Sequence, residues 1–335
     1  MRARLWLAFK VVATGALLFW ALRTVDLDGV AAALGSLGGA AIAAVVGLTF
    51  AAVAVSAWRW TRVLRRLGEN VTWPPLFGDT LVGMTYNLLL PTSVGGDVIR
   101  SVRCRRRLRA EEHAWASVAF ERVMGLVSLA LVSAVGLLSA TARVRNELLL
   151  LSIGIAGGLV LALLVAPNSL RLAGRAGDRL GLDRLAQTLH RMGDAFAGPL
   201  ATPRARLETF GWSLLYQGVS LAILFAAGLG WTDVDAWRLA RAVFLGVPIA
   251  LVLATAPITI GGFGLRESLF VTVLAPFGIA ADRAFALSLV WLASNLVGAT
   301  VGLVLTWRSP GTEAPPSGPE GTGPTRRDGS IRTAD

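Results

Sequence analysis

Apolar residues in this chain occur in long blocks that are separated by short arginine-rich segments. The blocks show neither the spacing of an amphipathic helix nor strict alternation, which is typical of helices surrounded by lipid. A helix needs about 20 residues to cross a hydrocarbon core of about 30 Å. Membrane spans are therefore predicted near residues 5–22, 39–58, 114–140, 148–166, 207–229 and 284–307.

Two further apolar stretches are interrupted by proline and glycine. The first covers residues 76–90 and ends at Pro91, and the second covers 239–278 and contains Pro248 and Pro257. A glycine pair follows Pro91 and Pro257 at the same spacing. Proline breaks a helix and glycine allows the backbone to turn, so both stretches are predicted as broken helices.

The basic residues predict the sidedness of the first broken stretch. The formal net charge is +11, and nearly all basic residues are arginines between the apolar blocks. Such clusters stay on the cytoplasmic side of a membrane. If 76–90 crossed completely, the arginine cluster at 100–109 would face outside. We therefore predict a re-entrant hairpin that enters from the cytoplasm, turns near 91–96 and returns.

The same argument places the termini and the second broken stretch. Arg2, Arg4 and Lys10 predict a cytoplasmic amino terminus, which is expected to act as an uncleaved anchor. A second hairpin around 257–264 is predicted to enter from outside. The last span then returns the chain to the cytoplasm, where the tail 309–335 is expected to be disordered.

The motif P-x-x-x-G-G-x-x-x-R directly follows the first broken stretch, at residues 91–100, and lies within the second, at 257–266. Because their predicted orientations are opposite, the predicted fold class is all-α integral membrane, with about six transmembrane helices and two re-entrant hairpins in an inverted-topology repeat. The membrane domain is predicted to cover 1–308, with halves of about 1–140 and 148–308. In the structural alternative, the motif only breaks helices or permits close packing.

Ionisable residues at membrane depth are functional candidates, because each costs about 2.5–3.5 kcal/mol to insert. Glu121 and Arg122 lie well inside a predicted span and can pair with charges on the first hairpin. Asp97 and Arg100 stand three residues apart, on one helical face. These four residues are predicted to lie together.

Broken helices in transporters bind substrate near the bilayer midplane. Arg100 and Arg266 are predicted to hold a phosphate, because a guanidinium offers a planar fork of donors. The side chains of Arg266 and Glu267 are adjacent in sequence and are expected to point in different directions. Asn87 and Asn295 are expected to line the cavity or to hydrogen-bond between helices. An ion-pair network that only holds the hairpins is the alternative. The candidate substrate-binding residues are Asn87, Pro91, Gly95, Gly96, Asp97, Arg100, Glu121, Arg122, Gly261, Gly262, Arg266 and Glu267.

Other chemistry has little support in the sequence. Cys104, His113 and His190 lie at no metal-ligand spacing, so no metal, disulfide or cofactor is predicted. The arginines follow the membrane pattern, so no nucleic-acid partner is expected. Asp79 and Glu208 are expected to be solvated charges near a cytoplasmic boundary.

Three motifs resemble the lysylphosphatidylglycerol synthase transmembrane family. They are Asn87-Leu-Leu-Leu-Pro91-x-x-x-Gly95-Gly96-Asp97-x-x-Arg100, Glu121-Arg122 and Pro257-x-x-x-Gly261-Gly262-x-Gly264-x-x-Glu267. The resemblance covers about 1–308 and implies a flippase-type protein of the bacterial plasma membrane that handles a phospholipid or a polyprenyl-linked lipid. Full-length synthases of the family carry a soluble catalytic domain that transfers lysine. Only a short tail follows the last span here, so lysine transfer is not expected.

The predicted function is translocation of an anionic phospholipid or polyprenyl phosphate lipid through a midplane site between the hairpins. One alternative is an intramembrane enzyme for glycosyl or phosphoryl transfer to a lipid-linked substrate, and another is an accessory subunit without a site. The absence of a recognisable catalytic motif from the sequence favours translocation. Membrane lipids are the expected partners, and a homo-oligomer or a separate lipid-modifying enzyme is also considered.

Cysteine labelling tests the predicted sidedness. Ser93→Cys and Ile260→Cys, each in a Cys104→Ser background, are expected to react with an impermeant maleimide from opposite sides of the membrane. The measurement is labelling in right-side-out and inverted vesicles. Reaction of both positions from the same side only would show that the inverted-hairpin topology is wrong.

Overall fold

The computed structural model describes residues 2–90, 94–137, 142–200, 202–256 and 258–308, and these residues form helices and connecting loops. The described residues contain no strand. The α-helices are α1 (Arg2–Thr24), α2 (Leu27–Gly35), α3 (Gly39–Arg66), α4 (Trp73–Leu89), α5 (Gly95–Arg105), α6 (Glu111–Leu137), α7 (Ala142–Arg179), α8 (Asp183–Ala197), α9 (Pro203–Gly228), α10 (Ala236–Arg241), α11 (Val247–Ala254), α12 (Leu265–Leu274) and α13 (Ala281–Arg308). Short η elements occupy Gly198–Leu200, Ala242–Gly246 and Ala275–Phe277.

Within the described residues, six helices are long and apolar enough to cross a membrane. They cover Gly39–Arg66, Glu111–Val135, Gly157–Arg179, Pro203–Gly228, Ala236–Ala254 and Ala281–Trp307. Five of them overlap predicted spans, Gly157–Arg179 only in part, whereas the predicted span 5–22 lies in α1, which is not among the six. The all-α membrane fold is thus confirmed, whereas the sidedness and the division into halves stay predictions.

The sixth span, Ala236–Ala254, belongs to a stretch that the sequence analysis interpreted as a broken helix. It runs through α10, a π-helical turn at Ala242–Gly246 and α11. Pro248 lies in the first turn of α11, directly after the π-helical turn. A proline cannot donate to the preceding turn and crowds its carbonyl group, and a π-helical turn relieves both constraints. The helix therefore continues past Pro248 and ends at Ala254.

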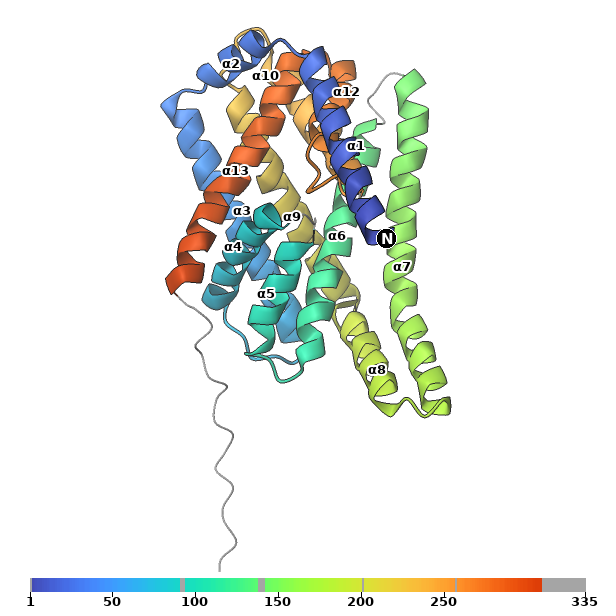
Figure 1. The fold of residues 1–335 in the computed structure, drawn as a ribbon. Coiled ribbons are helices and arrows are strands. Elements are labelled where there is room, and N and C mark those ends of the chain that lie inside the picture. The colour runs from blue at the N-terminus through green and yellow to red at the C-terminus, as the bar shows by residue number, and fades with distance from the viewer. Residues whose placement is uncertain (1, 91–93, 138–141, 201, 257, 309–335) are drawn as a thin grey trace, which may run out of the picture.

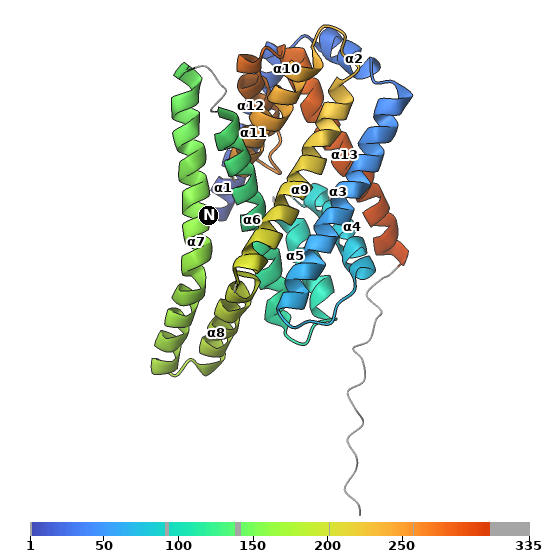
Figure 2. The same ribbon diagram turned by 180° about the vertical axis from the view of Figure 1, so that it is seen from behind.

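Two pairs of helices, α4 with α5 and α11 with α12, lie toward opposite ends of the molecule (Figures 1 and 2). The returning helices α5 and α12 contain 11 and 10 residues. At 1.5 Å per residue each is about 15 Å long, half of a hydrocarbon core. This geometry agrees with hairpins that turn inside the membrane, although their position in a membrane stays a prediction.

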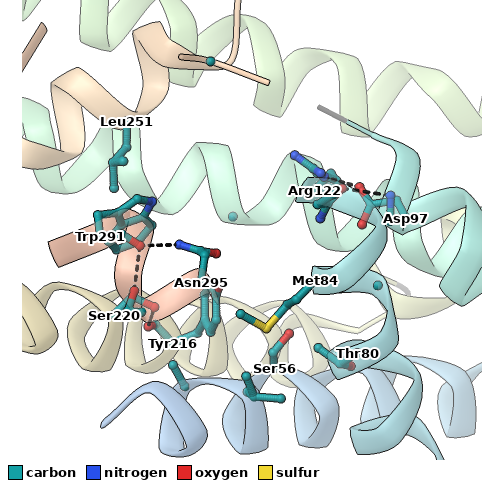
Figure 3. A pocket seen from close by; sticks show the side chains of 18 of the residues that line it. Ser56, Thr80, Met84, Asp97, Arg122, Tyr216, Ser220, Leu251, Trp291 and Asn295 are labelled. Atoms are coloured by element: carbon teal, nitrogen blue, oxygen red, sulfur yellow. Dashed lines mark hydrogen bonds and ion pairs between the residues drawn. The ribbon is translucent and has the colours of Figure 1, made fainter. Parts of the chain in front are cut away.

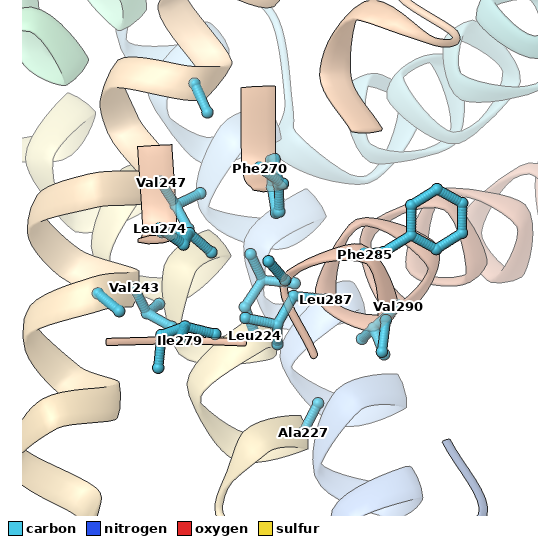
Figure 4. Packing of buried hydrophobic residues seen from close by; sticks show 14 of the residues in the cluster. Leu224, Ala227, Val243, Val247, Phe270, Leu274, Ile279, Phe285, Leu287 and Val290 are labelled. Carbon is cyan, nitrogen blue, oxygen red and sulfur yellow. The ribbon is translucent and has the colours of Figure 1, made fainter. Parts of the chain in front are cut away.

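The second pair rests on an apolar cluster formed by α2, α9, α11, α12 and α13 (Figure 4). Leu224, Phe270, Leu274 and Leu287 are completely buried in it. Lipid tails are as apolar as these side chains, so close packing rather than exclusion of water holds such a cluster together inside a membrane. The cluster fixes α12 to the ends of α9 and α13.

Close backbone contacts fix both pairs to neighbouring helices. On α13, a Cβ at Gly302 would overlap the carbonyl oxygen of Leu81 in α4. The second pair contacts α1, where the Ile260 N–H donates to Thr14 Oγ1 at 3.0 Å and Ser268 Oγ donates to the Leu17 carbonyl at 3.1 Å. Helix α7, by contrast, lies at the edge of the molecule beside α8 (Figures 1 and 2).

The contact between α4 and α13 predicts different outcomes for one substitution at two glycines. Gly302→Ala is expected to destabilise the fold by about 1–3 kcal/mol, because the added methyl group forces the helices apart. Gly47→Ala in α3 is the control, since nothing lies within 4 Å of its Cβ position. The measurement is thermal unfolding in detergent. Equal midpoints for the two variants would contradict close packing at Gly302.

Candidate functional site

A cavity of about 410 Å³ lies between the two helix pairs and is lined by residues of α3, α4, α5, α6, α9, α11, α12 and α13 and of the loop between α11 and α12. Figure 3 shows Asp97 and Arg122 on one side, and Tyr216, Ser220, Trp291 and Asn295 on the other. The cavity therefore has a charged side and a neutral polar side.

The charged side is a chain of ion pairs across three helices. Glu121 of α6 accepts from Arg59 Nε at 2.9 Å through Oε1 and from Arg100 Nη1 at 3.0 Å through Oε2. Arg100 Nε also donates to Asp97 Oδ1 at 3.0 Å, and Arg122 Nε donates to the other oxygen of Asp97. The predicted pairing of α6 with the first hairpin is thus confirmed, and Arg59 joins α3 to it.

Burial and aromatic rings hold two of these arginines in place. The guanidinium of Arg100 lies 4.9 Å from the Trp60 ring centroid, and that of Arg59 lies 5.2 Å from the Tyr216 ring centroid. The side chains of Arg59 and Arg100 are only 6% and 10% exposed, whereas Arg122 is 38% exposed. Arg122 is therefore the arginine of this network that is most open to a ligand.

The second pair brings a separate ion pair to the cavity. Arg266 Nε donates to Glu267 Oε1 at 3.1 Å, and the Glu267 Oε2 atom accepts the Gly264 N–H at 2.7 Å. The expected divergence of Arg266 and Glu267 is therefore wrong. The reason is helix capping, because Glu267 folds back over the first turn of α12 and thereby comes within reach of Arg266.

The two glycine pairs of the repeated motif adopt different backbones. Gly261 and Gly262 have positive φ angles of 60° and 80°, as expected for a turn. Gly95 and Gly96 instead form the start of α5. A Cβ at Gly96 would overlap the carbonyl oxygen of Gly83 in α4, so this glycine permits close packing.

Asn87 joins the two arms of the first hairpin, since its Oδ1 atom accepts the Gly96 N–H at 2.8 Å. The bond satisfies one of the donors that a helix start leaves unpaired. Asn295 donates to the Trp291 carbonyl of its own helix at 2.7 Å and faces the cavity. Both asparagines line the cavity, and Asn87 also makes the predicted bond between helices.

The expectation that Asp79 is solvated is wrong. Asp79 is completely buried and accepts from Arg103 at 2.8 Å and from Arg107. It connects α4 to α5 and to the loop that follows α5. Glu208 agrees better with its expectation, because its side chain is 27% exposed and pairs with Arg62 and Arg66.

Nine of the twelve candidate residues line the cavity, and whether they bind substrate stays a prediction. Gly95 and Glu267 are buried but do not line the cavity, and Pro91 lies outside the described residues. The nine are Asn87, Gly96, Asp97, Arg100, Glu121, Arg122, Gly261, Gly262 and Arg266.

Sequence reasoning missed Arg59 and the neutral side of the cavity. Arg59 directly follows the predicted span 39–58, where an arginine ordinarily marks sidedness. Small and polar lining residues nevertheless precede it at helical spacing in α3, namely Thr49, Ala52, Val53 and Ser56. Gln217 gave a usable signal, since it is an amide in the middle of an apolar block. Its Nε2 donates to the Gly125 carbonyl of α6 at 3.1 Å.

The described residues contain no group of three or more histidine, cysteine, aspartate or glutamate side chains that could hold a metal ion. Cys104 is completely buried, so its thiol is not exposed to solution.

Comparisons with known proteins agree with the membrane fold. The family model described as lysylphosphatidylglycerol synthase TM region matches residues 6–302. Glycosyltransferase AglD of Haloferax volcanii is 25% identical to this chain in an alignment 304 residues long, and the aligned region covers 78% of this chain and 48% of that protein. The chain thus spans about half the length of this curated relative. No solved structure matches the chain.

Two carboxylates of α6, Glu121 and Glu111, are predicted to contribute very differently to the free energy of unfolding. Glu121→Gln is expected to lower the free energy of unfolding by about 3–5 kcal/mol, because two buried guanidinium groups lose their charged partner. Glu111→Gln is the control and is expected to cost at most about 1 kcal/mol, since the Glu111 side chain is 69% exposed. Thermal or denaturant unfolding in detergent measures both. Similar losses would mean that Glu121 does not hold the network together.

Proposed function

The chain belongs to the lysylphosphatidylglycerol synthase transmembrane family, and we propose that it moves an anionic lipid between the leaflets of a bacterial plasma membrane. The observation that carries this proposal is the cavity between the two helix pairs, which is lined by four arginines. In transporters with broken helices, the substrate binds where such helices meet, and alternate opening exposes the site to each side.

The cost of arginine at membrane depth supports an anionic substrate. Each such charge is expensive to insert, so those that line a cavity mark a substrate path. A guanidinium offers planar, parallel donors that match phosphate oxygens. A lipid phosphate in the cavity compensates these charges while the lipid tails stay in the bilayer.

The contacts support different parts for the arginines in this proposal. Arg100 and Arg266 each hold a protein carboxylate, so a phosphate binds them only if it shares or displaces that partner. Arg122 is the most open member of the network around Glu121 and makes the first contact with the phosphate. Asp97 and Glu121 keep the neighbouring arginines in position and balance their charge.

A second candidate is glycosyl transfer within the membrane, which the name of the relative from Haloferax volcanii favours. Such a reaction requires a carboxylate that can accept a proton or an equivalent group. In the cavity, both oxygens of Asp97 and both oxygens of Glu121 already accept from arginines. The geometry therefore supports translocation better than transfer.

Transbilayer movement of labelled anionic phospholipids and polyprenyl phosphates in proteoliposomes tests the proposal. Arg100→Ala and Arg266→Ala are expected to abolish movement, and Arg122→Gln to slow it about tenfold or more, through loss of one charge-assisted contact with the phosphate. Arg105→Gln is the control for Arg122→Gln, because its side chain is 39% exposed but outside the cavity lining. Size-exclusion profiles check that each variant is folded.

Experiments in the same vesicles distinguish the two candidate functions. Movement without any change in the lipid supports translocation. A new glycosylated lipid on addition of a sugar donor would favour the enzyme, and folded protein with neither activity would leave the accessory role.

A further inference from the structure

We infer that the lipid headgroup is a phosphodiester monoanion that carries a neutral polyhydroxylated ring, such as a sugar or an inositol. This inference rests on the proposed function and deepens it. The observation behind it is the two-sided cavity, in which Asp97 and Arg122 face one part and Tyr216, Trp291 and Asn295 face another (Figure 3). One side suits a phosphate and the other an uncharged polar group.

The charge of the cavity sets the charge of the headgroup. The charged residues of the lining are Arg59, Asp97, Arg100, Glu121, Arg122 and Arg266. Glu267 pairs with Arg266, so four arginines meet three carboxylates. The cavity thus carries one surplus positive charge, which is costly at membrane depth unless an anion compensates it. A phosphodiester supplies a single negative charge.

The neutral side offers acceptors to hydroxyl groups. The amide groups of Gln217 and Asn295 donate to backbone carbonyls at 3.1 Å and 2.7 Å, which turns their side-chain oxygens to other partners. In the described part of the chain, these two oxygens accept no hydrogen bond and are not buried. Hydroxyl groups of a ligand satisfy such acceptors, whereas an apolar headgroup leaves them unpaired.

Trp291 adds aromatic surface to the same side, whereas the nearby Tyr216 ring already contacts Arg59. Trp291 has no aromatic or cationic partner among the described residues, so its ring is available to the cavity. The apolar C–H face of a sugar packs on an aromatic ring while its hydroxyl groups reach the amides. Aromatic rings and a few placed polar groups are the usual lining of a small-molecule site.

The size of the cavity agrees with a headgroup rather than with a whole lipid. Its volume of about 410 Å³ falls in the range of about 300–1,000 Å³ that small-molecule sites occupy. A phosphate and one sugar fit in this space, whereas lipid tails remain outside it. A phosphomonoester brings a second negative charge, and a lysyl headgroup brings amines that add to the surplus positive charge. Both fit the charge of the cavity less well.

Binding is tested apart from movement. Purified protein in detergent is heated with five lipids, namely polyprenyl phosphohexose, phosphatidylinositol, phosphatidylglycerol, polyprenyl phosphate and lysylphosphatidylglycerol. We expect the first two to raise the unfolding midpoint most and at the lowest concentration, at least about fivefold below the others. Stronger stabilisation by polyprenyl phosphohexose would indicate a polyprenyl lipid as the substrate, and stronger stabilisation by phosphatidylinositol would indicate a glycerophospholipid.

Trp291→Leu tests the neutral side directly. It is expected to reduce the preference for the headgroups with a sugar or inositol ring over phosphatidylglycerol, which has no ring to pack on Trp291, by about two- to tenfold, the factor that one aromatic contact gives. Trp307→Leu is the control on the same helix, since Trp307 is 78% exposed and lies outside the lining. Asn295→Leu, a second variant, is expected to act in the same direction as Trp291→Leu.

The outcomes separate this inference from the proposed function. Equal stabilisation by polyprenyl phosphate and polyprenyl phosphohexose, stronger stabilisation by the lysyl lipid, or an unchanged preference in folded Trp291→Leu protein would each overturn the inference. Lipid movement with no headgroup preference would retain translocation and reject the inference. Selective binding without movement would retain the inference and reject translocation.

Discussion

One carboxylate holds together the charged half of this structure. Glu121 accepts from Arg59 of α3 and Arg100 of α5, and all three residues are buried. Taking such charges out of water costs several kcal/mol per ion, so the arrangement is stable only while every member keeps its partners. The first hairpin, α3 and α6 are therefore fixed relative to one another by charge, and the cavity inherits its shape from them.

The second hairpin is held by a different kind of force. Apolar packing around Phe270 and Leu274 and backbone contacts with α1 fix it, and its ion pair, Arg266 with Glu267, lies within the hairpin itself. The cavity thus lies between one wall that is held by ion pairs between distant residues and another that is held by apolar packing and backbone contacts. Two walls with independent supports can move separately, which alternating access requires.

The sequence predicted the features that depend on composition and failed on those that depend on orientation. Long apolar blocks predicted five of the membrane-spanning helices, and ionisable residues inside them predicted the contact of Glu121 and Arg122 with the first hairpin. Arg59 was missed because its position at the end of a block resembles that of a residue that only marks sidedness. The pairing of Arg266 with Glu267 depends on how a cap folds back, which residue spacing does not determine.

The contacts of α1 have a consequence for biosynthesis. Thr14 accepts from Ile260, a residue 246 positions later in the chain. The amino-terminal helix is therefore synthesised long before the segment that it will hold. Contacts between such distant residues form late, because the loop between them must close first. The second hairpin is accordingly among the last parts of the protein to settle, and until then its irregular backbone lacks the partner that Thr14 provides.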